Sequence, residues 1–272
     1  MVLKKLFLSI IILTIATFAF GQGAIVNYGN NPSAGKYYPI RGIKMYAEVY
    51  GKGKPLLIIH GNGGSINNFA KNIPFFAQRY QVIVADSRAH GHSTDARDSL
   101  SFEMMADDYA ALLNAMHVHS AYVLGWSDGG INALVLAMRH PEKVIKLAST
   151  GANLWPDSTA LISSYWKDEQ KEYLAKKDMI FKTAKEKNDR KIFLLDWLEP
   201  NISLKDLKAI KCPSLIISGD RDLITLEHTV KLYQNITKSY LWILPNSGHG
   251  TLIEHTNEFN NKVDAFFSGS AF

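Results

Sequence analysis

The sequence predicts an α/β fold in which a mainly parallel sheet is covered by helices on both faces. Short β-rich apolar runs alternate along most of the chain with segments whose apolar residues recur at helical spacing. The 272 residues, 47% of them hydrophobic and 20% charged, can bury a full core, either as one α/β domain with an insertion or as two domains. Repeated strand–helix units need right-handed crossovers, which place parallel strands between two layers of helices.

The charge balance argues against a nucleic-acid-binding protein. The formal charge is +5 at pH 7 and includes Lys4 and Lys5, which we expect to be removed, so the mature chain carries about +3. This charge is too small and too dispersed to indicate a nucleic-acid partner. The composition also excludes a disordered or fibrous protein.

Residues 1–21 are typical of a signal peptide. Lys4 and Lys5 precede an uncharged apolar run over 6–20, and small residues precede a cleavage that we expect after Gly21. The run is shorter than the about 20 residues of a spanning helix; retention as an N-terminal anchor is the alternative. We expect a secreted or periplasmic protein with no stable membrane insertion after cleavage. Cys212 is the single cysteine, so no internal disulfide can form.

The first half of the chain contains three predicted strands after a linker. Residues 22–36 are rich in Gly, Asn, Pro and Ser and indicate a linker with little structure, so that order begins near Tyr37. Alternating apolar and polar residues over 40–49 predict an edge strand, and a turn leads into a central strand at 56–59. A helix around 69–77, a strand at 82–85, a loop at 86–93 and a helix around 105–116 follow.

The same alternation continues to the C-terminus. We expect strands at 121–124, 144–148, 213–218 and 240–244, and helices around 131–138, 226–233 and 259–267. These elements form a predicted core of residues 37–153 and 203–272.

One segment, 154–202, interrupts the alternation. It has no strand pattern, but its helical stretches are rich in Lys, Glu and Asp and carry the aromatic residues Trp155, Tyr165, Trp166, Tyr173, Phe181, Phe193 and Trp197. We expect a helical lid over the C-terminal edge of the sheet, where ligands bind in open α/β folds. The alternative is a peripheral helical layer whose aromatic side chains pack onto the core.

The stretch Gly125-Trp126-Ser127-Asp128-Gly129-Gly130 lies between a predicted strand and a predicted helix. A Gly-x-Ser-x-Gly sequence in this context is typical of a nucleophile elbow, a strained turn that leaves no room for side chains beside the serine. Ser127 is therefore the candidate nucleophile.

A serine nucleophile needs a histidine base, which in turn needs a carboxylate. His249 follows the last predicted strand between two glycines and is preferred over His255, which lies on the approach to the final helix. Asp220 and Asp222 both follow the preceding strand. Physical reasoning leaves the two open, since one of them can simply hold the turn.

An acyl-transfer site also needs two donors for the oxyanion. The N–H of Asp128, at a helix N-terminus, is one candidate, and the N–H of Asn62, in the glycine-rich loop after the strand 56–59, is the other. The alternative for this loop is a turn without a ligand role.

From Tyr37 to Phe267 the chain resembles the α/β-hydrolase family. The segments that carry the resemblance are the His60-Gly61 loop, Asp86-x-Arg88-x-His90-Gly91-x-Ser93, the elbow, Gly219-x-x-Asp222 and Ser247-Gly248-His249. The resemblance implies an eight-stranded type of sheet with a helical lid, and it favours Asp222 as the acid. Within the family, the elbow and Gly151-Ala152-Asn153 are similar to the valacyclovir hydrolase and biphenyl hydrolase-like serine hydrolases.

That closer resemblance implies that Asp128 helps to bind a substrate's α-amino group. The alternative is that the carboxylate stabilises the helix N-terminus electrostatically. Trp126 is a second candidate for substrate contact. The early loop and the export signal differ from these relatives and leave the substrate open.

Two other groups have simpler explanations. Asp86, His90 and His92 resemble metal ligands, but no further ligand cluster accompanies them, and we expect a structural role with Arg88 bracing the loop. The stretch from Lys167 to Lys191 mixes both signs of charge, which is typical of a solvated helical face.

The sequence therefore predicts a serine hydrolase that cleaves a small carboxylic ester through an acyl-enzyme, with no cofactor and no metal. The lid's Trp and Tyr residues favour an apolar or aromatic group of modest size. An aminopeptidase and a carbon–carbon bond hydrolase on the same triad are alternatives, as is a ligand-binding receptor of this fold. The oligomeric state stays open.

Overall fold

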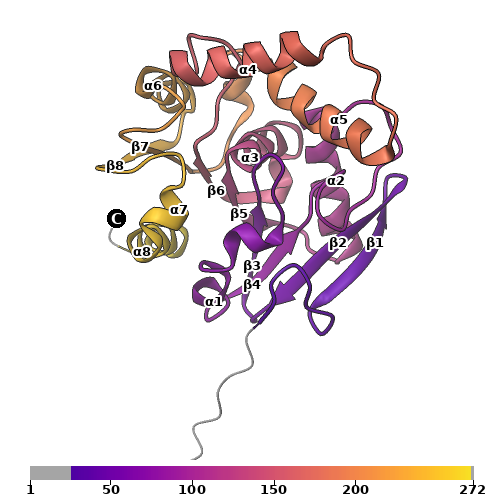
Figure 1. Cartoon of the computed structure of the whole chain (residues 1–272). Coiled ribbons are helices and arrows are strands. Elements are labelled where there is room, and N and C mark those ends of the chain that lie inside the picture. The colour runs from indigo at the N-terminus through magenta and orange to yellow at the C-terminus, as the bar shows by residue number, and fades with distance from the viewer. Residues whose placement is uncertain (1–25, 271–272) are drawn as a thin grey trace, which may run out of the picture.

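Eight strands form one sheet in the computed structural model, which describes residues 26–270 (Figure 1). The predicted signal segment, 1–21, lies outside these residues. The strands are β1 (Gly35–Ile40), β2 (Ile43–Tyr50), β3 (Lys54–Ile59), β4 (Tyr80–Ala85), β5 (Ala121–Trp126), β6 (Val144–Thr150), β7 (Ser214–Gly219) and β8 (Ser239–Leu244). Their order is β1-β2-β4-β3-β5-β6-β7-β8, and all pairs beyond β2–β4 are parallel, which confirms the predicted fold class.

Helices cover both faces of this sheet. The α-helices are α1 (Ile73–Phe76), α2 (Phe102–Ala115), α3 (Asp128–Arg139), α4 (Ser163–Lys176), α5 (Ala184–Leu198), α6 (Leu226–Asn235), α7 (Thr251–Glu254) and α8 (Thr256–Ser268), with 3₁₀ turns η1 (Ile66–Phe69), η2 (Pro141–Lys143) and η3 (Asp206–Ala209). Leu57 and Ile59 pack with α2, α3 and α6, whereas Leu56 and Ile58 pack with α1 and α8. All four side chains of this strand are fully buried, as expected of a parallel strand covered on both faces. Within residues 26–270, no helix combines the length and apolar character needed to cross a bilayer.

The predicted edge strand over 40–49 is wrong in its position. It corresponds to β2, which lies between β1 and β4, and the edge is β1. A two-residue hairpin, Arg41 and Gly42, joins β1 to β2, and both residues have positive φ, 43° and 85°. Arg-Gly is a weaker hairpin signal than Asn-Gly or Asp-Gly, so the sequence pattern did not separate the two strands.

The described part of the predicted linker, 22–36, is ordered against the sheet. Gly35 and Lys36 belong to β1, so order begins before Tyr37. The N–H groups of Gly29 and Asn31 donate to the carboxylate of Glu48, at 2.9 and 2.8 Å. Glu48 is fully buried in β2, and a buried carboxylate requires such donors.

Two helices, α4 and α5, form the segment between β6 and β7, and Figure 1 shows them above the edge where the parallel strands end. We call residues 154–202 the lid. α4 buries none of its residues and α5 buries only Lys191 and Leu195. Trp166 and Tyr173 instead stack on Trp197, at 6.4 and 5.1 Å between ring centroids. These aromatic rings therefore pack within the lid.

Candidate active site

The turn between β5 and α3 has the geometry of a nucleophile elbow. Ser127 adopts φ 56° and ψ −124°, a conformation that costs a non-glycine residue about 1–3 kcal/mol. Its N–H donates to the carbonyl of Thr150 at 2.9 Å, which fixes the turn to β6. A β-carbon at Gly125 would collide with the carbonyl of Gly129, and one at Gly129 with that of Ile59. The strand–turn–helix context that the sequence predicted is present.

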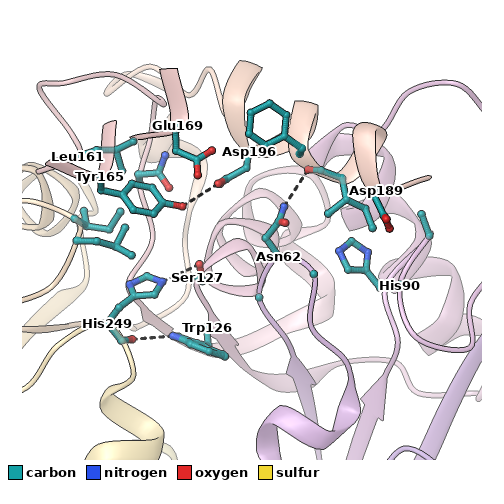
Figure 2. A pocket seen from close by; sticks show the side chains of 18 of the residues that line it. Asn62, His90, Trp126, Ser127, Leu161, Tyr165, Glu169, Asp189, Asp196 and His249 are labelled. Atoms are coloured by element: carbon teal, nitrogen blue, oxygen red, sulfur yellow. Dashed lines mark hydrogen bonds between the residues drawn. The ribbon is translucent and has the colours of Figure 1, made fainter. Parts of the chain in front are cut away.

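Three side chains from separate loops form a continuous hydrogen-bonded chain. His249 Nε2 lies 2.9 Å from Ser127 Oγ, and His249 Nδ1 lies 2.7 Å from Asp222 Oδ1 (Figure 2 shows the first pair). The Asp222 carboxylate is fully buried and also accepts bonds from Ser218 Oγ at 3.2 Å and the Ile224 N–H at 3.1 Å. The arrangement matches a nucleophile, a base and an orienting acid.

The two alternatives that the sequence left open have other partners. Asp220 is exposed and accepts the Ser247 N–H at 3.1 Å, so it holds the turn before His249. His255 Nε2 lies 3.3 Å from the carbonyl of Asn246. Neither side chain belongs to the series of hydrogen bonds that ends at Ser127.

Trp126 lines the cavity and also holds the loop that carries His249. Its Nε1–H donates to the carbonyl of His249 at 2.8 Å (Figure 2). On the other side of the same loop, Glu254 accepts the N–H of Gly248 at 2.8 Å. Sequence analysis missed this role of Glu254, which lies five residues after His249 without a motif of its own.

The two expected oxyanion donors lie on the loop after β3 and at the first residue of α3. Among residues 26–270, no protein acceptor bonds to the backbone N–H of Asn62 or Asp128. The loop approaches the nucleophile closely, because a β-carbon at Gly61 would lie 3.0 Å from Ser127 Cβ. Their roles as oxyanion donors stay predictions.

The side chains of the same two residues contact each other, which the sequence did not predict. Asn62 Nδ2 donates to Asp128 Oδ2 at 2.8 Å and lies 3.2 Å from the carbonyl of Ile192 in α5 (Figure 2 shows the second bond). Burial, and then the charge of Asp196, raise the pKa of Asp128 well above its ordinary value. Asp128 is only 3% exposed.

A cavity of about 620 Å³ lies above Ser127, within the range of small-molecule sites. Its apolar lining includes Leu161, Ile192, Phe193, Leu223 and Ile224. Of the lid's aromatic residues, Tyr165 and Phe193 line the cavity and the tryptophans do not. The expectation that the lid's tryptophans contact the substrate is therefore wrong, because Trp166 stacks on Trp197 and Trp155 packs on His228 of α6.

The expected solvated face from Lys167 to Lys191 is also wrong in part. Glu169 lines the cavity, and burial, followed by the charges of Asp196 and Glu172, raises its pKa to about 7. Lys191 is buried and donates to Asp95 at 2.7 Å. A spacing of four residues between Tyr165 and Glu169 was the signal that could have placed both on one helix face.

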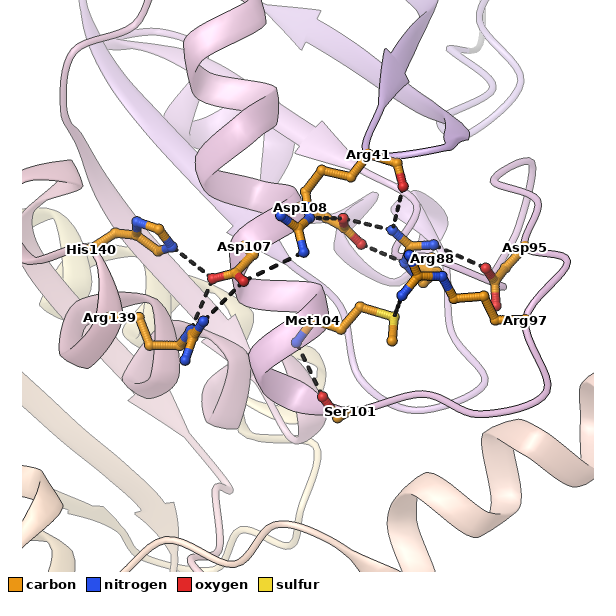
Figure 3. A network of polar contacts seen from close by, with 10 residues as sticks. All are labelled: Arg41, Arg88, Asp95, Arg97, Ser101, Met104, Asp107, Asp108, Arg139 and His140. Carbon is orange, nitrogen blue, oxygen red and sulfur yellow. Dashed lines mark hydrogen bonds and ion pairs between the residues drawn. The ribbon is translucent and has the colours of Figure 1, made fainter.

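The loop 86–93 is held by protein contacts. Asp86 Oδ1 accepts the N–H of Ile66 at 2.9 Å and Oδ2 that of His92 at 2.7 Å, which explains this carboxylate without a metal. Arg88, 1% exposed, braces the loop as expected: it bonds Asp108 at 2.6 and 2.7 Å and Asp95 at 2.9 Å (Figure 3).

Comparison with known proteins agrees with the fold. The family described as alpha/beta hydrolase fold matches residues 54–188. The chain is 28% identical to the serine hydrolase BPHL of Mus musculus, over 84% of each chain. It is 25% identical to a 2-hydroxymuconate semialdehyde hydrolase of Pseudomonas sp. strain CF600, over 88% of this chain and 95% of that one.

A solved structure titled "Est816 as an N-Acyl homoserine lactone degrading enzyme" is 26% identical and superposes with a TM-score of 0.69, over 85% of this chain and all of that one. The order of the strands in the sheet, the strained turn at Ser127 and the family match all indicate the same fold. The chain belongs to the α/β-hydrolase fold family.

Proposed function

We propose that this protein hydrolyses a small carboxylic ester through an acyl-enzyme on Ser127. The observation that carries the proposal is the chain of two hydrogen bonds, 2.9 Å from Ser127 Oγ to His249 Nε2 and 2.7 Å from His249 Nδ1 to Asp222. Binding a ligand does not require these three side chains to be hydrogen-bonded in series beside a cavity of about 620 Å³, whereas ester hydrolysis does.

The reaction follows from these contacts. Ser127 Oγ attacks the ester carbonyl while His249 takes its proton, and Asp222 stabilises the resulting imidazolium. The N–H groups of Asn62 and Asp128 stabilise the oxyanion. His249 then returns the proton to the leaving alcohol, and a water that it activates releases the acid and restores Ser127.

The acidic lining of the cavity disfavours an anionic substrate. Glu169, Asp189 and Asp196 line the cavity, and none of its described lining residues is Lys or Arg. In their ionised forms Glu169 and Asp196 would repel an anionic substrate such as the one named for the muconate semialdehyde hydrolase. A cationic group of a substrate would be attracted to them instead.

A fluorophosphonate probe tests the nucleophile. Wild type is expected to be labelled, and Ser127→Ala is expected to be unlabelled and inactive on p-nitrophenyl esters while keeping its melting temperature. No labelling of folded wild type would favour the receptor alternative. Peptide amides and a vinylogous diketone, assayed beside the esters, distinguish the aminopeptidase and the carbon–carbon bond hydrolase.

Export remains a proposal based on residues 1–21. N-terminal sequencing of protein expressed with its own leader tests it, since cleavage predicts a first residue near Gln22. A chain that begins at Met1 and stays with the membrane fraction would support the anchor.

A further inference from the structure

The loop that carries the expected oxyanion donor Asn62 is made mostly of glycine. Asn62 lies between Gly61 and the pair Gly63 and Gly64, and Gly63 has a positive φ of 61°. The Gly64 N–H donates to the carbonyl of Gly61 at 3.1 Å, which closes a turn around Asn62. Glycines give a turn conformational freedom and no side chain that could anchor it. Within residues 61–64, therefore, only Asn62 has a side chain that can reach another element.

The side chain of Asn62 bonds two other elements. An amide nitrogen carries two hydrogens, and Asn62 Nδ2 donates to Asp128 Oδ2 at 2.8 Å and to the carbonyl of Ile192 at 3.2 Å (Figure 2 shows the bond to Ile192). Asp128 is the first residue of α3, directly after the nucleophile, and Ile192 belongs to α5 of the lid. The two bonds thus hold the turn to the elbow on one side and to the lid on the other.

Asp128 presents its carboxylate to Asn62 rather than to the cavity. The residue is 3% exposed and is not among those that line the cavity above Ser127. Burying a carboxylate is costly unless a donor satisfies it, and the bond from Asn62 does so. A residue without an acceptor at position 128 would leave the Asn62 amide with one of its two bonds.

We propose that Asp128 is a positioning residue for the oxyanion hole, the pair of N–H groups that stabilise the oxyanion: its carboxylate holds the Asn62 side chain and so fixes the direction of the Asn62 backbone N–H. This inference rests on the proposed ester hydrolysis and deepens it. A displaced donor costs rate, because hydrogen bonds to an oxyanion are most effective when they are preorganised. Both backbone N–H groups remain when the side chains are changed, so a loss of activity measures their position.

Substitutions on both sides of the bond test the proposal. With a p-nitrophenyl ester, Asp128→Ala and Asn62→Ala are each expected to lower kcat about 10- to 100-fold and to change KM less than about 3-fold. Asp128→Asn, whose side-chain oxygen can still accept from Asn62, should recover most of this loss. The double variant should be no slower than either single variant, because both changes remove the same bond. Asp178→Ala, at an exposed position of the lid, is the control and should match wild type.

Two outcomes of these assays would overturn the proposal. Additive losses in the double variant would show that the two side chains act separately. A loss in Asp128→Asn as large as that in Asp128→Ala would show that the negative charge matters and the hydrogen bond does not. If Asp128→Ala does not fold, Asn62→Ala and Asp128→Asn still provide the comparison.

A tetrahedral adduct measures the oxyanion hole more directly. Ser127 Oγ adds to the carbonyl carbon of a trifluoromethyl ketone, its proton passes to His249, and the carbonyl oxygen becomes an oxyanion. The matching carbinol cannot form this bond. Asp128→Ala and Asn62→Ala should weaken inhibition by trifluoromethyl hexyl ketone at least about 10-fold and inhibition by its carbinol less than about 3-fold. Equal weakening of both would refute the proposal, because it would indicate a change of the whole cavity.

Hydrogen exchange keeps this inference separate from the proposed function. If wild type neither hydrolyses esters nor reacts with a fluorophosphonate, the proposed function fails, but the anchoring of the turn can still be measured. The Gly64 N–H, which closes the turn, is expected to exchange at least about 10-fold faster in Asp128→Ala and Asn62→Ala than in wild type, whereas the N–H groups of β3 should exchange as before. Unchanged exchange at Gly64 in both variants would show that the bond does not hold the loop.

Discussion

The burial of His60 predicts that the protein loses measurable stability in acid. His60 follows β3, is 1% exposed, and uses both ring nitrogens: Nδ1 lies 2.7 Å from the Gly61 carbonyl and Nε2 accepts the Ser87 N–H at 2.9 Å. A proton on Nε2 would break the bond to Ser87 and place a charge in the protein interior. Burial accordingly lowers the pKa of His60 from 6.5 to about 4.

The sign and size of the effect follow from this pKa. Between pH 6.5 and 4 the unfolded chain binds a proton at His60 that the folded chain does not, so the free energy of unfolding rises with pH in this window. Lowering the pH from 7 to 4.5 should therefore cost about 2 kcal/mol through His60 alone.

Urea denaturation of wild type and His60→Gln at both pH values isolates this contribution, because glutamine can donate and accept hydrogen bonds but does not titrate. The loss between pH 7 and 4.5 should be smaller in His60→Gln by about 2 kcal/mol. His255→Gln, at a partly exposed site, should lose as much as wild type. Equal losses in wild type and His60→Gln would refute the argument that burial holds the ring neutral.

Three further outcomes can be checked by substitution. Asp222→Asn should lower kcat on an ester by about 10⁴-fold, whereas Asp220→Asn should change kcat little; similar losses would mean that the acid is misassigned. Lys191→Met should lower the free energy of unfolding by about 2 kcal/mol, because Asp95 loses one of its two buried partners and keeps Arg88, and the exposed Lys187→Met should change it by less than about 0.5 kcal/mol. Gly129→Ala should abolish fluorophosphonate labelling, since its β-carbon would meet the carbonyl of Ile59; a labelled variant would contradict the steric argument for the elbow.

The sequence alone was enough to predict those parts of the fold in which a local pattern of residues has one usual structure. The fully buried strand Leu56–Ile59 and the strand before Ser127 are continuous apolar runs, which are typical of parallel strands covered on both faces. Ser127, Asp222 and His249 follow strands that end at one edge, so their order along the chain placed them together. Family resemblance was still needed to separate Asp222 from Asp220, because the two carboxylates follow Gly219, the last residue of β7, by only three residues and one residue.

The lid was less predictable because its polar residues are placed by tertiary contacts. α4 and α5 mix Lys, Glu and Asp throughout, so a surface carboxylate and a cavity-lining one look alike in the pattern. What distinguishes Asp196 from Asp189 is the neighbour it meets after folding, a tyrosine hydroxyl in one case and Lys185 in the other. Burial of Lys191 likewise depends on Asp95, 96 residues away in the chain.

The elbow connects the chemistry to the lid through one side-chain amide. Ser127 directs its Oγ to His249, while the next residue, Asp128, accepts a bond from Asn62, whose backbone N–H is the expected second oxyanion donor. The same Asn62 amide lies 3.2 Å from the carbonyl of Ile192, one helical turn before Asp196. The position of α5 therefore affects the loop that carries the oxyanion donor.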